Sequence, residues 1–409
     1  MAVEIDPDRF RDSFDSYSAV GATDDGGLHR LTLSDADREA RDAFVADCED
    51  LGLDVRIDEL GNIFARREGN NPDAAPVMIG SHLDSQPFGG RYDGQLGVLT
   101  ALETLRAFED AGIEPDRPIE LVNWTNEEGS RFEQAMMGSG VWAGAIPKDE
   151  ALSLTDGEGK TVAEELERIG YAGDVPCEPH DVHAYLELHV EQGPQLERAG
   201  DAVGVVEGVF GMSWLEATIH GEANHAGPTT MPARRDALAT AAEAASRIHT
   251  MPNRLSADAV ATVGRFEVEP NSINVIPDEV TFTIDVRSYD DAVVDRAVEE
   301  AEFEIATAAD REGTTYDLAQ LWKIPHTEFS PVVREAVADA ATAVDAEYQH
   351  IVSGAGHDAN RLNTVTDAGM IFVPSVDGIT HSEAEYTEWS DCVAGARVYA
   401  NATLALASE

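Results

Sequence analysis

The sequence contains little cysteine, and it has no long apolar segment. Its three cysteines, Cys48, Cys177 and Cys392, are far apart and form no CxxC pair. This spacing excludes a disulfide framework and fits a reducing compartment. No apolar run reaches the ~20 residues of a membrane span, and the first residues, MAVEIDPDRF, lack the basic and apolar regions of a signal peptide. We therefore predict a cytoplasmic protein without membrane contact.

Positive charge is scarce as well. There are 28 basic and 78 acidic residues, which give a formal net charge of −50, and lysine occurs only at Lys148, Lys160 and Lys323. The acids are spread along the whole chain, so the entire surface is expected to repel itself in dilute buffer. Salt at about 1 M shortens the screening length to roughly 3 Å and removes most of this repulsion. The composition predicts a halophilic protein and disfavours nucleic acid as a partner.

The pattern of apolar residues predicts two domains, because 409 residues exceed one ordinary core. Short apolar strands alternate with amphipathic helices, such as 34–51 with Ser34 as its N-cap, over residues 1–212 and again over 326–409. This alternation is typical of an α/β domain with a central mixed, largely parallel sheet flanked by helices. Residues 213–325 instead suggest strand, helix, strand, strand, helix, which predicts an inserted α+β domain.

Polar side chains with metal-binding chemistry follow the first predicted strand. "APVMIGSHLDS" places His82 at the strand end and Asp84 two residues later. A histidine can bind a metal through one ring nitrogen while a carboxylate orients the other nitrogen. Asp93 follows in "GGRYDGQLG", at the start of a predicted helix. Taken alone, Asp93 is better explained as a helix N-cap than as a ligand.

Three further strands end in the same way. "LVNWTNEEG" ends in Glu127 and Glu128, "YLELHVEQG" carries His189, and "FVPSVDGITHSE" carries His381. Each of these residues alone is more often exposed or structural than a ligand. The carboxyl ends of parallel strands, however, meet at one edge of a sheet. Together these residues could hold two divalent ions, with one carboxylate bridging them.

The whole set of motifs resembles one branch of a known family. "SHLDS…GGRYDGQLGV…TNEEGSRF…ELHVEQGP…NHAGPT…NVIP…DVRS…SGAGHDA…HSE" looks like the amidase/carbamoylase branch of the M20-type metallohydrolases. That branch includes N-carbamoyl-L-amino acid hydrolases, β-ureidopropionases and allantoate amidohydrolases. The resemblance runs from about residue 26 to the C-terminus.

The resemblance implies a centre of two divalent ions (Zn, Mn, Co or Ni) in each subunit. His82, Asp93 and His189 would bind one ion, and Asp93, Glu128 and His381 the other, so that Asp93 would bridge them. Glu127 would be the general base, and Asp84 would orient His82. Related peptidases place an acid where His189 stands, and the histidine therefore favours cleavage of ureides over cleavage of peptides.

The resemblance also implies substrate contacts and a partner. Gln192, Asn274 and Arg287 would bind the substrate, the last two through its carboxylate, for which the planar fork of arginine is suited. The inserted domain would be a lid that forms a homodimer, and its His225 would polarise the scissile carbonyl in the partner's active site. The loop that contains "SGAGHDANR" has no assigned role, and its Asn360 and Arg361 stand where apolar residues are expected.

These features predict an enzyme that cleaves the carbamoyl C–N bond of a small ureido carboxylate. N-carbamoyl-L-amino acids or N-carbamoyl-β-alanine would give an amino acid, ammonia and carbon dioxide. An allantoate amidohydrolase would need the same motifs, so that alternative stays open. A dipeptidase or aminoacylase is disfavoured by His189. A non-catalytic dimeric scaffold is disfavoured because every expected ligand is present.

Overall fold

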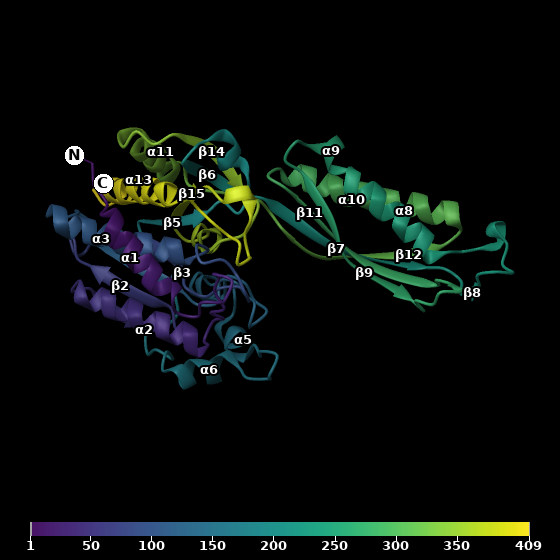
Figure 1. Ribbon diagram of the computed structural model, residues 1–409, viewed down its shortest axis with the longest axis horizontal. Helices are drawn as coiled ribbons and strands as arrows, with labels where there is room; N and C mark the ends of the chain where they lie inside the picture. Colours follow the sequence, from purple (N-terminus) through teal and green to yellow (C-terminus); the bar gives the residue numbers. More distant parts are fainter. Residues whose placement is uncertain (1, 409) are drawn as a thin grey trace. The chain divides into compact units, whose positions relative to one another are not determined.

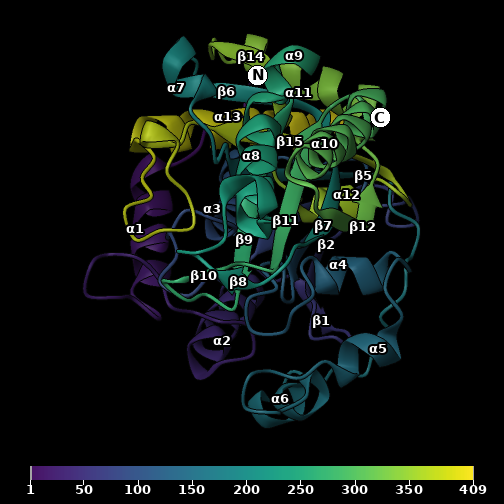
Figure 2. The same ribbon diagram turned by 90° about the vertical axis from the view of Figure 1, so that its right-hand side faces the viewer.

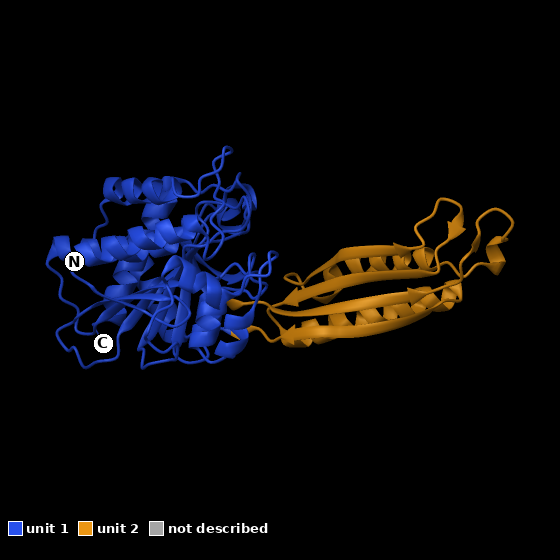
Figure 3. Cartoon of the chain, turned by 90° about the horizontal axis from the view of Figure 1, so that it is seen from below, with its two compact units in different colours: residues 1–207, 328–409 blue, residues 208–327 orange. Residues whose placement is uncertain are grey.

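The computed structural model describes residues 2–408 and divides the chain into two compact units. The first unit comprises Met1–Glu207 and Glu328–Glu409, and the second comprises Gly208–Thr327 (Figure 3). The sequence placed this division at residues 213 and 325. The sequence pattern does not define this boundary more sharply, because only one residue separates the strand Val203–Val209 from the next strand, Gly211–His220.

A nine-stranded mixed sheet forms the centre of the first unit (Figure 1). Its four central strands are parallel and lie in the order β4 (Ile119–Trp124), β3 (Val77–His82), β5 (Ala184–Val190) and β15 (Asp367–Val373). On one side follow β2 (Ile63–Arg67) and β1 (Asp54–Ile57), both antiparallel to their neighbours. On the other side lie β6 (Val203–Val209), β13 (Thr327–Glu328) and β14 (Tyr348–Ser353). The mixed sheet agrees with the prediction, and its parallel part is these central strands.

Helices cover both faces of the parallel strands, and every residue of β3, β4 and β5 is therefore buried. Successive side chains of β5 show the two faces. Leu188 meets Gly395 of α13 (Trp389–Leu406), whereas Glu187 accepts a hydrogen bond from the backbone N–H of Ala359 in α12 (Asp358–Leu362). No helix within residues 2–408 is both long enough and apolar enough to cross a bilayer.

The helix that precedes β1 has its N-cap where the sequence predicts, and the helix that follows β3 ends at a glycine. In α2 (Asp35–Asp50) the Ser34 hydroxyl accepts a hydrogen bond from the backbone N–H of Asp37, as an N-cap does. α3 (Gln95–Ala111) ends at Gly112, whose φ of 62° is left-handed. The remaining helices of this unit are α1 (Pro7–Ser18), α4 (Met137–Trp142), α5 (Lys148–Ser153), α6 (Val162–Ile169), α7 (Gln195–Ala199), α11 (Pro331–Ala343) and the 3-10 turn η2 (Val376–Gly378).

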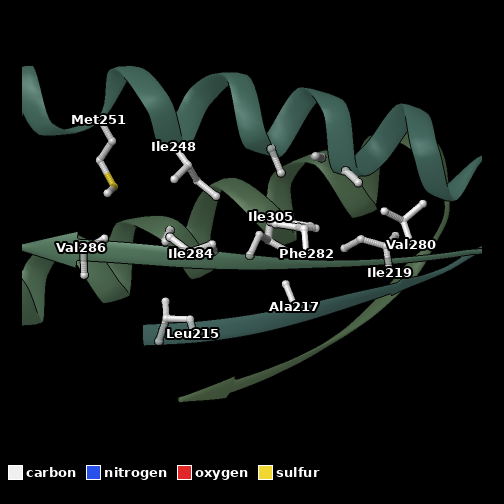
Figure 4. Packing of buried hydrophobic residues seen from close by; sticks show 14 of the residues in the cluster. Leu215, Ala217, Ile219, Ile248, Met251, Val280, Phe282, Ile284, Val286 and Ile305 are labelled. Atoms are coloured by element: carbon white, nitrogen blue, oxygen red, sulfur yellow. The ribbon is translucent and has the colours of Figure 1, made fainter. Parts of the chain in front are cut away.

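The second unit is a four-stranded antiparallel sheet with two helices on one face. The strand order is β12 (Thr315–Ile324), β7 (Gly211–His220), β11 (Glu279–Ser288) and β9 (Val260–Glu269). α8 (Ala237–Thr250) and α10 (Asp291–Glu312) lie side by side over it (Figure 2). The core between these layers is apolar and takes every second residue of β7 and β11 (Figure 4), including Leu215, Ala217, Ile219, Val280, Phe282, Ile284 and Val286.

Edge strand β12 was not recognised in the sequence. Its residues alternate only between exposed and half-buried, because the strand has a neighbour on one side and helices on one face. Its apolar residues also lose their regular alternation at Gln320–Trp322, where the pairing with β7 is irregular. The main sheet of the unit therefore contains one strand more than the sequence indicated. Its smaller elements are β8 (Asn224–His225), β10 (Val275–Ile276), η1 (Met231–Ala233) and α9 (Pro252–Leu255).

Candidate metal centre

The predicted ligands of the first unit come together at the carboxyl ends of the parallel strands. His82 is the last residue of β3, and His189 is the last but one of β5. Glu127 and Glu128 follow β4, and His381 lies in the loop after β15. The strands are adjacent and parallel, so four segments far apart in the sequence deliver side chains to one place.

Asp93 lies at the centre of this cluster, and its two carboxylate oxygens face different histidines. Oδ1 is 3.0 Å from His189 Nε2 and 3.4 Å from His82 Nε2, whereas Oδ2 is 3.5 Å from His381 Nε2. His381 Nε2 is in turn 3.6 Å from Glu128 Oε2. Two sets of potential ligand atoms, His82–Asp93–His189 and Asp93–Glu128–His381, each lie within 4.8 Å of one another. A carboxylate shared by both sets has the arrangement of a bridging ligand.

The chemistry of these groups fits two divalent ions. His82 Nε2 is buried and has no hydrogen-bond partner, although an unpaired buried polar atom is unfavourable by about 1–3 kcal/mol. A bound cation would satisfy that atom. The mixed imidazole and carboxylate donors suit Zn²⁺, Mn²⁺, Co²⁺ and Ni²⁺, all of which accept nitrogen and oxygen ligands.

The backbone around Asp93 brings the helix close to His82. α3 begins at Gln95, and its N-cap is Gly94, with no side-chain capping bond. The alternative interpretation of Asp93 as the N-cap is therefore wrong. Gly94 has a φ of 62°, and a Cβ atom there would lie 2.3 Å from the His82 ring. Only glycine combines this conformation with this approach, and it leaves Asp93 directed at the histidines.

Three residues that follow strand ends have left-handed backbones, namely Asn126 (φ 56°), Gln192 (φ 58°) and His381 (φ 52°). Non-glycine residues rarely adopt this conformation, and it concentrates at functional sites. The Asn126 side chain holds its loop by donating to the carbonyls of Phe132 and Gln134. Asn126 directly precedes Glu127 and Glu128, whereas Gln192 and His381 themselves lie against Asp93 Oδ2.

Asp84 contacts the cluster differently from the sequence-based prediction. His82 Nδ1 donates to the backbone carbonyl of Asp84 at 3.0 Å, whereas the Asp84 carboxylate is 3.7 Å from that nitrogen. The carboxylate instead accepts hydrogen bonds from the backbone N–H groups of Glu127 (3.3 Å) and Glu128 (3.4 Å). Asp84 therefore orients the histidine through its main chain and positions the two acids through its side chain.

Glu127 is buried beside the cluster, with Oε2 3.5 Å from His82 Nε2. Burial raises the pKa of the Glu127 carboxyl well above its ordinary value; the charge of His82 opposes this shift, and Glu128 and Asp93 add to it. A carboxyl whose pKa is moved toward neutrality is suited to accept and return a proton. Burial also opposes ionisation of Asp93, but His189 and His82 more than offset it and lower the pKa of Asp93 well below its usual range.

Residues that the sequence did not single out support the ligands. Gln86 holds the Glu128 carboxylate through its backbone N–H (2.9 Å) and side-chain amide (2.7 Å). The His357 ring packs 4.5 Å from that of His189, and its Nε2 is 3.1 Å from the Ser353 hydroxyl. Burial, followed by the charge of His189, lowers the pKa of His357 well below its usual value, so His357 is neutral. "SGAGHDA" pointed to this loop, but nothing in the sequence pointed to Gln86.

The predicted substrate-binding residues fall in both units. Gln192 is in the first unit, and its amide donates to Asp93 Oδ2 at 2.8 Å. His225 and Asn274 are in the second unit, where β8 pairs with β10 and Ala226 N–H donates to the Asn274 carbonyl. Arg287 lies on β11 and forms an ion pair with Asp285 at 2.8 Å. The contacts of these last three residues with substrate stay predictions.

Comparison with known proteins identifies the family. A model of peptidase family M20/M25/M40 matches residues 78–405. The N-carbamoyl-L-amino-acid amidohydrolase of Rhizobium meliloti is 41% identical over 400 residues, which are 98% of this chain and 96% of the relative. The allantoate amidohydrolase of Escherichia coli is 34% identical over 388 residues, 94% of either protein.

A solved structure agrees with this similarity. An amidase of the hydantoinase/carbamoylase family from Burkholderia multivorans is 45% identical and has a TM-score of 0.96, and the match covers 100% of this chain and 99% of that one. Its fold is therefore shared over the whole length, both units included. From the matches in sequence and in structure, the chain belongs to peptidase family M20/M25/M40, in its hydantoinase/carbamoylase branch of amidohydrolases.

Proposed function

We propose that this protein hydrolyses the carbamoyl C–N bond of N-carbamoyl-L-amino acids or N-carbamoyl-β-alanine. One water and one substrate give the amino acid, ammonia and carbon dioxide. The observation that carries the proposal is the buried Glu127 beside a cluster of His82, Asp93, Glu128, His189 and His381 that can hold two ions. The 41% identical relative named for N-carbamoyl-L-amino acids supports this substrate class.

Each residue of the site then has a defined task. Bound divalent ions would supply positive charge that polarises the carbonyl and acidifies water. Glu127 takes a proton from the attacking water at its carboxylate and returns it to the leaving nitrogen. His225 Nδ1 accepts the backbone N–H of Gly227 at 3.0 Å, which leaves the proton of the neutral ring on Nε2. From Nε2 this histidine would donate a hydrogen bond, in the partner subunit's active site, to the oxygen on which negative charge develops.

The substrate panel that tests the proposal measures ammonia release. The protein is loaded with Mn²⁺ or Zn²⁺ and assayed in roughly 2 M KCl, above the ionic strength at which the screening length is about 3 Å. N-carbamoyl-L-amino acids, N-carbamoyl-β-alanine, allantoate and a dipeptide are compared. Preference for a carbamoyl compound supports the proposal. Preference for allantoate favours the second candidate, to which the 34% identical relative points, and cleavage of the dipeptide alone overturns both.

We further propose that the second unit forms a homodimer. The family resemblance places dimer contacts in this inserted unit and gives His225 a role in the partner's active site. Sedimentation measurements on the metal-loaded protein test the proposal, and a monomer that retains full activity would contradict it. Such a result would leave the assignment of the metal cluster unaffected.

Removal of the Arg287 side chain should weaken substrate binding. Hydrogen bonds between charged groups contribute about 1.5–3 kcal/mol, so Arg287→Ala should lower kcat/KM roughly 10- to 100-fold, chiefly through KM. The control is Arg265→Ala, in exposed strand β9 of the same sheet. The assay compares an N-carbamoyl amino acid with its neutral carboxamide. Equal losses for both would show that Arg287 does not bind the carboxylate.

Stability should depend strongly on salt, as the net charge of −50 implies. The Tm should rise between about 0.1 M and 2 M KCl as the screening length falls from about 10 Å to below 3 Å. The physical reason is that carboxylates on the folded surface stop repelling one another. Thermal unfolding in KCl is compared with unfolding in sucrose, which stabilises without screening charge. A Tm that rises no more in KCl than in sucrose would contradict the prediction of halophily.

A further inference from the structure

Glu385 is a buried acid that belongs to neither set of potential ligands, yet it contacts the cluster directly. Its exposed fraction is 4%. Oε1 accepts hydrogen bonds from the backbone N–H groups of Tyr92 and Asp93, each at 3.1 Å. Oε2 accepts from the Thr380 hydroxyl, also at 3.1 Å. One carboxylate thus joins the segment before α3 to the segment that carries His381.

These contacts are part of a closed ring of hydrogen bonds. The Gln192 amide donates to Asp93 Oδ2 at 2.8 Å and lies 3.2 Å from the Thr380 hydroxyl oxygen. The ring runs from the Asp93 carboxylate through Gln192, Thr380 and Glu385 and returns to the Asp93 backbone. It fixes both the backbone and the side chain of Asp93 relative to Thr380, whose neighbour is His381.

Gly90 provides the space for this carboxylate. A Cβ atom at this position would lie 2.0 Å from Glu385 Oε1, so no other residue could stand there without displacing the acid. The second glycine of "GGRYDG" is thus explained by Glu385, almost 300 residues further along the chain. Since a buried carboxylate is unfavourable unless it is well hydrogen-bonded, the three donors and the glycine form a site built around this side chain.

The histidines of the two ligand sets lie on different kinds of structure, strands in one set and a loop in the other. His82 and His189 belong to central strands, whose ladders of hydrogen bonds fix them. His381 lies on a loop, its side chain is 49% exposed, and its backbone has a strained, left-handed conformation. The spacing of 3.5 Å between His381 Nε2 and Asp93 Oδ2 therefore depends on contacts within the loop. The ring through Glu385 joins this loop to the backbone of Asp93, and the Gln192 amide of the same ring also lies 3.4 Å from His381 Nε2.

We propose that Glu385 is a positioning residue that sets the distance between Asp93 and His381 and thereby the affinity of the Asp93–Glu128–His381 position for its ion. The inference rests on the two-ion centre of the proposed function. The affinities of the two positions for their ions should depend on the ring to different degrees. When the ring is broken, the His82–Asp93–His189 position keeps its two histidines, because they lie on strands. The other position loses the restraint on His381.

The experiment is a metal titration that does not involve substrate. Chelator-treated wild-type protein and the variants Glu385→Gln and Thr380→Val are titrated with Co²⁺, whose visible absorption reports coordination, and the bound ions are counted by mass spectrometry. Thr380→Val breaks the ring but leaves Glu385 on the backbone of Tyr92 and Asp93, so it remains informative if the first variant does not fold. Glu383→Gln, in the same loop, is the control, and the Tm of each metal-free protein is recorded.

The expected result is that the first Co²⁺ binds both variants as it binds wild type. The second ion should bind about 10- to 100-fold more weakly, which is the usual effect of removing a group that orients a ligand, while Glu383→Gln changes neither. Wild-type affinity for both ions in Glu385→Gln or Thr380→Val would overturn the inference. An equal loss at both positions would also overturn it, because it would indicate general damage to the scaffold. Failure of wild-type protein to bind two ions would instead count against the proposed function.

Discussion

Glu127→Gln is expected to lower kcat about 10²- to 10⁴-fold, the range that a positioned acid or base contributes, while both ions remain bound. Glutamine has nearly the same shape as glutamate, but its amide cannot take a proton from water or pass one to the leaving nitrogen. Glu127 is buried next to the cluster without being a member of either ligand set. The substitution therefore removes the proton carrier and leaves the ligands in place.

The measurement combines initial rates of ammonia release with the metal content of the same sample. Glu133→Gln is the matched control, since Glu133 lies exposed in the loop that follows Glu127 and the change in charge is the same. The control should retain the rate of wild type. A general base contributes at least about 10²-fold to the rate. If the rate of Glu127→Gln were within about tenfold of the wild-type rate, Glu127 would not be that base.

The sequence predicted that the candidate ligands would gather at one edge of the sheet, because that arrangement follows from local patterns. The buried strands of six or seven residues near whose ends His82, Glu127 and His189 lie are parallel, and their carboxyl ends therefore meet at one edge of the sheet. The N-cap at Ser34 and the end of α3 at Gly112 are equally local. Each of these features requires only knowledge of a few neighbouring residues, which a sequence displays directly.

The features that escaped prediction are not visible in local patterns, and one of them depends on residues far apart in the chain. Glu385 holds the backbone of Asp93 across 292 positions, and no periodicity marks it as buried. The role of Asp84 was misjudged because the sequence shows that a carboxylate is near His82 but not which of its oxygen atoms faces the ring. Strand β12 was missed because it lies at the edge of its sheet, where the alternation of apolar residues is weak.

Asp93→Asn should remove metal and turnover together, in contrast to Glu127→Gln. The two oxygens of Asp93 serve both ligand sets, and asparagine offers one neutral oxygen in their place. The amide nitrogen of asparagine would face either His381 or the pair His82 and His189, and it cannot ligate a cation. We expect the metal content to fall from close to two ions per chain to one or fewer, and ammonia release to fall below detection.

Metal analysis after equilibration with a limiting concentration of Zn²⁺ or Mn²⁺ tests this expectation. Asp149→Asn, an exposed site in α5, changes the charge equally and should leave both readings unchanged. Two ions bound to Asp93→Asn with wild-type affinity would show that Asp93 does not bridge them. Loss of a single ion with activity retained would show that one position alone supports catalysis. If Asp93→Asn loses both ions while Glu127→Gln keeps its ions but is inactive, the two roles are distinguished. Asp93 then holds the ions, and Glu127 transfers the proton.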